Sequence, residues 1–206
     1  MTSISIIGSG KMSGAIAEVA MRAGASIQII KRSATSPSAA RPGFAYGVMG
    51  DELTGDIVVL AVPYVAYASI LDHYRDQLSE KVIVDISNPI DFSTYDELTS
   101  PADSSTAAEL AQMLPEGAGV VKAFNVNLGD TLASGTNGTT TTTVLYAGDF
   151  ADAKMAVAQL IEASGMRAVD VGPLTRAREL EAMGFLQIIM AALGKTRYES
   201  GFTLLQ

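Results

Sequence analysis

"SISIIGSGKMSGAIAEVAMRAGASIQIIKRS" (Ser3–Ser33) combines two apolar runs with a glycine turn and an amphipathic segment. The first run, Ser3–Ile7, predicts a strand, and the apolar residues of Met12–Arg22 have helical spacing. The second run, Ser26–Ile30, predicts another strand that stops at three polar residues. A strand, a tight turn, a helix and a second strand form the first half of a doubly wound α/β unit.

The alternation of strand and helix patterns continues along the chain. Further strands are predicted at Phe44–Val48, Asp56–Val62, Lys81–Ile86, Val120–Phe124, Thr140–Ala147 and Arg167–Val171. Further helices are predicted at Val65–Tyr74, Thr106–Met113 and Asp149–Ser164, with Asp149 as the N-cap of the last. Continuous apolar runs such as "IVVLAV" are typical of strands that are buried on both faces of a parallel sheet.

We therefore predict an α/β fold of the Rossmann type, with a doubly wound, mostly parallel sheet, helices on both faces and a short C-terminal helical appendage. Residues 1–172 would form the dinucleotide-binding domain and residues 173–206 the appendage. Helical spacing in Arg176–Lys195 places a helix there, either across the sheet or at a dimer contact. The segments Ser33–Gly43 and Asn88–Thr106 are expected to be loops, the second long enough to be a binding lid or simply mobile.

Composition excludes several classes of function. The 206 residues carry a net charge of -8, which argues against nucleic acid or an anionic membrane as a partner. No apolar run reaches about 18 residues and no secretory signal is evident, so we expect a cytoplasmic protein without a membrane span. The chain has no cysteine. Residues 1–50 nevertheless carry a local charge of +4, from five basic residues and one acidic residue, which suits a small polyanion.

The glycine turn predicts a phosphate site. Gly8 would permit the tight turn after the strand, Gly10 would let the backbone approach a pyrophosphate, and Ser13 stands where a third glycine would complete the fingerprint. Amides at the start of the helix would then bind the phosphates. A glycine pattern alone could mark only a turn, but the flanking strands and helix favour a dinucleotide. The predicted contact set is Gly8, Ser9, Gly10, Lys11, Met12 and Ser13.

The end of the second strand predicts which dinucleotide binds. A carboxylate there would contact the ribose hydroxyls of NAD, but no Asp or Glu occurs between Ala23 and Gly50. Arg32 could pair with a 2′-phosphate, Ser33 could donate a hydrogen bond and Lys31 would add charge. Although the three residues could also be an ordinary solvated loop, we predict NADP(H).

Three other strand ends carry residues that could surround a nicotinamide and a second substrate, because ligands of such sheets lie beyond the carboxyl ends of the strands. Ala61, Val62 and Pro63 are predicted to form a wall for the ring, and Ser87 and Asn88 to meet its carboxamide. The predicted substrate-binding residues are Tyr64, Asn125 and Asn127. Each has an alternative, since prolines also stop strands and asparagines favour turns.

No catalytic acid, base or nucleophile is predicted. His73 lies in a helix of mixed charge and is expected at the surface, and no metal-ligand cluster or Ser/His/Asp set is evident. Asp56 and Asp85 flank buried strands, but nothing pairs them as an acid and a base, and no Schiff-base lysine in an apolar setting is evident. Hydride transfer between two cofactor rings needs mainly proximity and orientation, which this set of residues could supply.

The chain also resembles a known family, the NADPH-dependent coenzyme F420 oxidoreductases, and the related cytoplasmic domain of the STEAP metalloreductases. The resemblance is carried, in order, by "IIGSGKM" (Ile6–Met12), "KRS", "DIVVLAVP" (Asp56–Pro63), "KVIVDISNP" (Lys81–Pro89), "VVKAFN" (Val120–Asn125) and "DVGPL" (Asp170–Leu174). It implies NADP(H) bound at Gly8–Ser13, Arg32 and Ser33, a homodimer, and a second substrate that is a flavin (FMN or FAD) or the deazaflavin F420. Tyr64, Ala66 and Asn125 stand where the F420 enzymes typically have other residues, and Asn125 is closer to the STEAP pattern.

The function expected from the sequence is therefore hydride transfer between NADPH and a flavin-like or deazaflavin acceptor. Two alternatives remain open. One is a non-catalytic NADP(H)-binding sensor. The other is a small imine reductase of the pyrroline-5-carboxylate type, which would need a long helical C-terminal domain beyond Lys195.

Overall fold

The computed structural model describes residues 2–33, 41–91 and 93–204. Its main sheet has eight strands in the order β10-β9-β6-β5-β4-β1-β2-β3, and all neighbours are parallel except β6 and β9. The strands are β1 (Ser3–Ile7), β2 (Ser26–Lys31), β3 (Phe44–Val48), β4 (Ile57–Leu60), β5 (Val82–Asp85), β6 (Gly119–Ala123), β9 (Thr143–Gly148) and β10 (Arg167–Asp170). The predicted Rossmann-type fold is confirmed.

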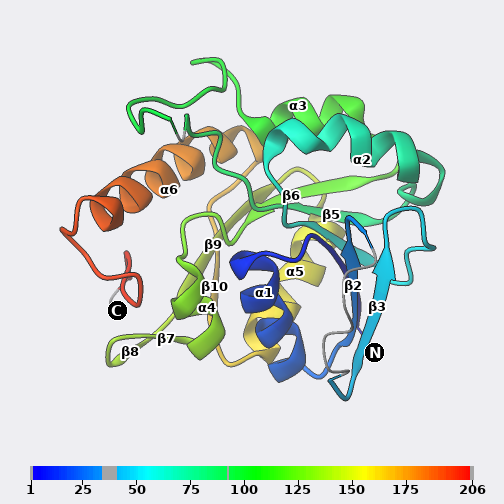
Figure 1. Ribbon diagram of the computed structural model, residues 1–206, viewed down its shortest axis with the longest axis horizontal. Helices are drawn as coiled ribbons and strands as arrows, with labels where there is room; N and C mark the ends of the chain where they lie inside the picture. The colour runs from blue at the N-terminus through cyan, green and yellow to red at the C-terminus, as the bar shows by residue number, and fades with distance from the viewer. Residues whose placement is uncertain (1, 34–40, 92, 205–206) are drawn as a thin grey trace.

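Helices cover both faces of the sheet (Figure 1). They are α1 (Lys11–Arg22), α2 (Tyr67–Tyr74), α3 (Thr106–Met113), α4 (Gly129–Ser134), α5 (Ala151–Ala163) and α6 (Ala177–Ala192), with 3₁₀ turns η1 (Tyr64–Ala66), η2 (Arg75–Gln77) and η3 (Leu174–Arg176). Among the described residues, no helix is both long enough and apolar enough to cross a membrane.

Side-chain alternation along the strands builds two cores. In β4, Ile57 and Val59 pack with α1 and α5 on one face. Val58 and Leu60 pack with α2 and α3 on the other face. All four side chains are buried, so the continuous apolar run follows from a strand that is covered on both sides.

The C-terminal helix returns to the sheet. α6 packs against α3 and β9, and Leu174, Ala177 and Leu180 at its start belong to the buried cores. Figure 1 shows it running along the side of the molecule that carries β9. The helix therefore lies where it can contact the strand ends, while the division between residues 172 and 173 stays a prediction.

Two local predictions are wrong. Thr140–Ala147 is not one strand, because Thr140–Thr141 (β8) pair with Thr136–Asn137 (β7) in a hairpin and Thr142 interrupts the run. The Thr142 hydroxyl donates to Thr131 O and its amide to Gly135 O, which removes it from the ladder. The N-cap of α5 is Phe150 rather than Asp149, whose carboxylate instead accepts a hydrogen bond of 2.8 Å from the amide of Leu174.

Candidate functional site

The residues of the glycine turn between β1 and α1 have two roles, since some hold the turn in place and one leaves space for a ligand. Gly8 has a φ of +129°, and a Cβ on it would lie 2.2 Å from Ala61 O, so the turn is pressed against the end of β4. A Cβ on Gly10 would meet no atom within 4 Å. Ser13 is buried and its hydroxyl donates to Gly8 O at 2.8 Å. Gly8 and Ser13 therefore hold the turn, and Gly10 leaves open space beside the helix start.

A cavity of about 900 Å³ adjoins this turn. Its lining comes from the ends of β1, β2 and β4 and from α2, and includes Gly8, Ser9, Gly10 and Arg32. None of the described residues that line it is acidic, and α1 has no acidic residue in its first turn. A helix N-terminus, an open glycine and a guanidinium around one cavity fit the phosphates of a dinucleotide.

The other basic residues of the predicted site lie around this cavity without lining it. Lys11 is exposed and pairs with Asp130 at 2.8 Å. The Lys31 ammonium lies 4.9 Å from the centre of the Tyr46 ring. Ser33 is exposed and precedes residues 34–40, which are outside the described residues together with most of the predicted Ser33–Gly43 loop. His73 is exposed as expected, and it also lines the cavity.

A second cavity, of about 370 Å³ and mostly apolar lining, shares a wall with the first. The shared residues are Ala61, Val62, Pro63 and Val65. The remaining lining includes Met12, Tyr64, Ser87, Asn88, Thr99 and Ile188. The predicted residues of β4 and β5 are thus brought together at one edge of the sheet, and α6 closes the cavity through Ile188.

Tyr64 enters the second cavity from η1, and its hydroxyl donates a short hydrogen bond to the Glu109 carboxylate on α3. Burial and this carboxylate raise the pKa of Tyr64 to about 12. The hydroxyl therefore stays protonated at ordinary pH and its proton points to Glu109.

Asn88 and Asn125 form a reciprocal pair. The Asn88 amide donates to Asn125 O at 2.8 Å, and the Asn125 amide donates to Asn88 Oδ1 at 2.9 Å and to Leu180 O at 2.8 Å. Asn125 is buried and does not line either cavity. Asn127 is also buried, away from them, and donates to Thr143 O. The pair ties the ends of β5 and β6 to α6, while the predicted substrate-binding role of Asn125 and Asn127 stays a prediction.

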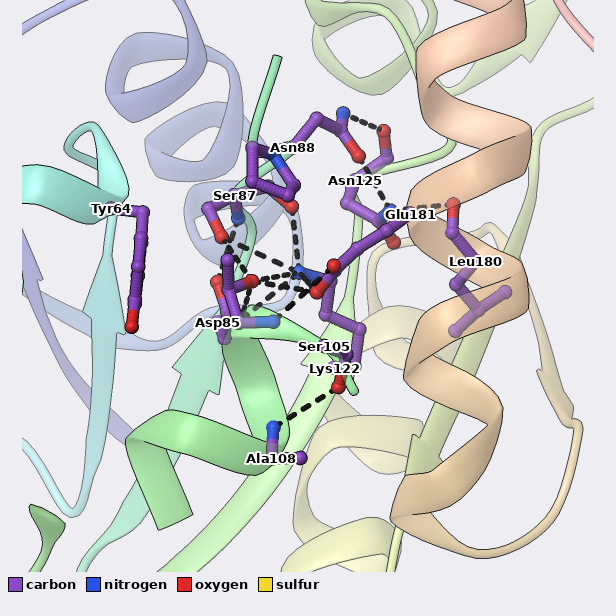
Figure 2. Close-up of polar contacts among 12 residues, drawn as sticks. Tyr64, Asp85, Ser87, Asn88, Ser105, Ala108, Lys122, Asn125, Leu180 and Glu181 are labelled. Atoms are coloured by element: carbon purple, nitrogen blue, oxygen red, sulfur yellow. Dashed lines mark hydrogen bonds and ion pairs between the residues drawn. The ribbon is translucent and has the colours of Figure 1, made fainter. Parts of the chain in front are cut away.

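A buried ionic cluster of Asp85, Lys122 and Glu181 lies next to Ser87 (Figure 2). Ser87 in turn lines the second cavity. Lys122 on β6 is fully buried, and its ammonium contacts Asp85 Oδ2 at 2.9 Å, Glu181 Oε1 at 2.8 Å and Ser87 O at 2.6 Å. These three nearest acceptors match its three protons, and Thr106 Oγ1 and Ser87 Oγ lie farther away at 3.2 and 3.4 Å. Asp85 and Lys122 thus form a buried ion pair that was not predicted from the sequence.

The cluster holds Asp85 in its ionised form. Burial alone would raise the pKa of Asp85, but the Lys122 ammonium, the Tyr67 hydroxyl and the Ser87 amide outweigh it and lower the pKa below its usual value. Tyr67, fully buried, donates to Asp85 Oδ1 at 2.6 Å, and burial together with this carboxylate raises the pKa of Tyr67 well above its usual value. The sequence did carry a signal, since Lys122 and Asp85 are charged residues within buried strands and must have partners.

Comparison with known proteins supports this picture. Residues 3–89 match the family described as "NADP oxidoreductase coenzyme F420-dependent", which confirms the resemblance found in the sequence. The chain is 30% identical to Metalloreductase STEAP3 of Rattus norvegicus over 87% of its own length and 36% of that protein. It is 30% identical to F420-dependent NADP reductase of Methanocaldococcus jannaschii over 63% of its length and 59% of that protein. The chain thus spans between about a third and three fifths of these curated relatives.

One solved structure covers nearly the whole chain. A protein from Arthrobacter sp. FB24, provisionally assigned as an F420-dependent NADP reductase, superposes over 98% of this chain and 99% of its own with a TM-score of 0.85 at 24% identity. This likeness shows the fold over nearly the whole chain.

Proposed function

We propose that the chain transfers hydride between NADP(H) and a flavin-like or deazaflavin molecule. The match of residues 3–89 to the family described as "NADP oxidoreductase coenzyme F420-dependent" supports this proposal. The observation that carries this proposal is the pair of adjoining cavities. One is lined by the glycine turn and Arg32, and the other is mostly apolar and shares the wall Ala61–Pro63 with it.

In this proposal the first cavity binds the dinucleotide by its phosphates. The free amides at the start of α1 would face the pyrophosphate, and Arg32 would pair with the 2′-phosphate. Bound NADPH would supply the hydride, or NADP⁺ would accept it in the reverse direction. The two cavities meet at Ala61, Val62 and Pro63. This wall would therefore hold the edge of the nicotinamide next to the ring of the acceptor and limit the access of water.

The second cavity suits the acceptor because its lining is mostly apolar and comes from several elements. Proximity and alignment of two rings are the main requirements for hydride transfer between cofactors. Tyr64, Met12 and Ile188 present flat or flexible apolar surface for a ring system. F420 is the acceptor that the family description favours, and FMN and FAD are the other candidates.

A homodimer is part of the proposal. Leu186 and Leu193 lie on or just after α6 and are 52% and 67% exposed, so this side of the helix offers apolar surface to a second copy. Light scattering after size exclusion would give the mass in solution.

The test combines binding and turnover. The purified protein would be titrated with NADPH, and FMN, FAD or F420 would then be added separately while nicotinamide absorbance is followed. Oxidation with one acceptor supports an oxidoreductase and names its substrate class, whereas binding without turnover on any of them favours an NADP(H)-binding sensor.

A charge-reversal variant tests the phosphate placement. Arg32→Asp should weaken NADPH binding by about tenfold or more and NADH binding much less, because a carboxylate would face the 2′-phosphate. Arg41→Asp is the matched control, since Arg41 pairs with Glu18 at 2.7 Å and does not line the cavity. Equal losses for NADPH and NADH in Arg32→Asp would refute the placement.

A further inference from the structure

The second cavity has an unusual arrangement of hydroxyl groups. Three of its lining residues carry a hydroxyl: Tyr64, Ser87 and Thr99. Tyr64 donates to Glu109 and Thr99 donates to Pro89 O at 3.1 Å, so both protons point into the protein. The direction of the Ser87 hydroxyl depends on its partner, Thr106.

Thr106 has one hydroxyl proton and two carboxylate neighbours. Its Oγ1 lies 2.6 Å from Glu181 Oε1 and 3.1 Å from Asp85 Oδ2. Asp85 and Glu181 are the acid groups of the buried cluster, and both of these oxygens face the Lys122 ammonium. The Thr106 proton therefore goes to a carboxylate, and its oxygen is left to accept.

The direction of the Thr106 proton determines the direction of the Ser87 hydroxyl proton. Ser87 Oγ lies 2.8 Å from Thr106 Oγ1, and one of the two must donate. Since the Thr106 proton is already used, Ser87 donates to Thr106. Its main-chain carbonyl is taken by Lys122 at 2.6 Å, and its hydroxyl lies 3.4 Å from the same ammonium, which only donates. Ser87 therefore keeps only lone-pair capacity for anything bound in the cavity.

Few polar groups of the lining lie beside Ser87. Pro63 and Pro89 in the lining have no N–H. The Asn88 side chain accepts from Asn125 through Oδ1 and donates one of its two N–H groups to Asn125 O. At Ser87 itself, polar recognition is therefore by an acceptor.

We propose that Thr106, held by Glu181 and Lys122, is a positioning residue that fixes the Ser87 hydroxyl as an acceptor. The site is then selective for a ligand that presents an N–H to Ser87, which means a carboxamide rather than a carboxylate. The inference rests on the proposed function, in which the nicotinamide edge lies against this wall. It adds Thr106 as a residue that acts through Ser87 without touching the ligand itself.

The test compares NADP⁺ with its nicotinic acid analogue, which has a carboxylate in place of the carboxamide and cannot donate. Dissociation constants of both would be measured by calorimetry at neutral pH for the wild type, Thr106→Val and Thr106→Ser. The wild type should prefer NADP⁺ by about tenfold or more, the value of one well-placed polar contact.

Thr106→Val removes the acceptor for the Ser87 proton but keeps the size of the side chain and the charge of the cluster. The hydroxyl then turns toward the cavity and can donate to the carboxylate, so the preference should fall to about threefold or less. Thr106→Ser keeps the hydroxyl and should keep the preference. A merely structural defect would weaken both ligands alike and leave their ratio unchanged.

Ser87→Ala gives a second measurement that leaves the cluster intact, and it should lower the preference by weakening NADP⁺ alone. An unchanged ratio in both Thr106→Val and Ser87→Ala, with NADP⁺ still bound, overturns the inference by itself. Failure of the wild type to bind NADP⁺ overturns the proposed function and the inference together.

Discussion

Replacement of Lys122 by Met tests the buried cluster most directly. The ammonium is fully buried and makes three contacts of 2.6–2.9 Å to Ser87 O, Glu181 and Asp85. Its removal leaves two carboxylates buried without a cation. Breaking a buried pair on one side typically costs about 3–5 kcal/mol, a large part of the stability of a domain of this size.

The number of charges in the cluster predicts which variants lose more stability. The cluster has two carboxylates and one ammonium, so Glu181→Gln leaves a balanced Lys122–Asp85 pair and should cost less than Lys122→Met. Lys154→Met is the control, because Lys154 pairs with Asp170 at 3.0 Å with side chains 21% and 42% exposed. Such a pair contributes about 0.2–1 kcal/mol.

The assay is urea unfolding followed by circular dichroism at pH 8 and pH 5. In the wild type the pKa of Asp85 is lowered, so the stability it contributes is present above its unfolded pKa of about 4 and is lost as pH falls through the folded value. In Lys122→Met, Asp85 loses its cation, so burial should raise the folded pKa of this carboxylate. The variant should therefore recover stability relative to the wild type as the pH falls from 8 to 5.

Two results would refute this reasoning. One is a loss of less than about 1 kcal/mol at pH 8, similar to the Lys154 control. The other is a loss that is the same at both pH values, which would mean that the carboxylates are not what Lys122 stabilises.

Four further variants have expected outcomes. Gly8→Ala should destabilise the fold by several kcal/mol, because its Cβ would meet Ala61 O, whereas Gly10→Val should cost about 1 kcal/mol in thermal unfolding yet abolish dinucleotide binding. Gly184→Ala should destabilise by about 1–3 kcal/mol despite the better helix former, since its Cβ would lie 2.4 Å from Asn88 Oδ1; an unchanged melting temperature would contradict the close packing of α6. Tyr64→Phe should remove one phenol that ionises near pH 12 from an ultraviolet titration and leave the pH profile of turnover below pH 10 unchanged.

The fold could be predicted from local patterns because its strands are buried on both faces. Apolar runs identified β1 and β2 to within one residue and β4 with one extra residue at its start and two at its end, and the glycines placed the turn after β1. These features depend on neighbours along the chain. The hairpin at Thr136–Thr141 was missed because Thr favours strands, while the break at Thr142 depends on a contact with Thr131 on another element.

The candidate site was predictable only where it is made of strand ends. Parallel strands bring Pro63 and Ser87 to one edge of the sheet, so their meeting at a cavity followed from topology. The charged cluster did not follow, because Glu181 comes from a helix 59 residues beyond Lys122 and no local pattern aims it at β6. The sign of the cluster in the sequence was Lys122, a charged residue within the apolar run "GVVKAF".

The inward direction of the hydroxyl protons bears on the reaction as well as on selectivity. Reduction of an imine or a carbonyl needs a proton at the reacting atom, usually from a positioned side chain. In the described lining of the second cavity, Tyr64 donates to Glu109 and Thr99 to Pro89 O, and in our inference Ser87 donates to Thr106. Hydroxyl protons that are already bonded within the protein fit the proposed hydride transfer between two rings better than they fit the reduction of an imine.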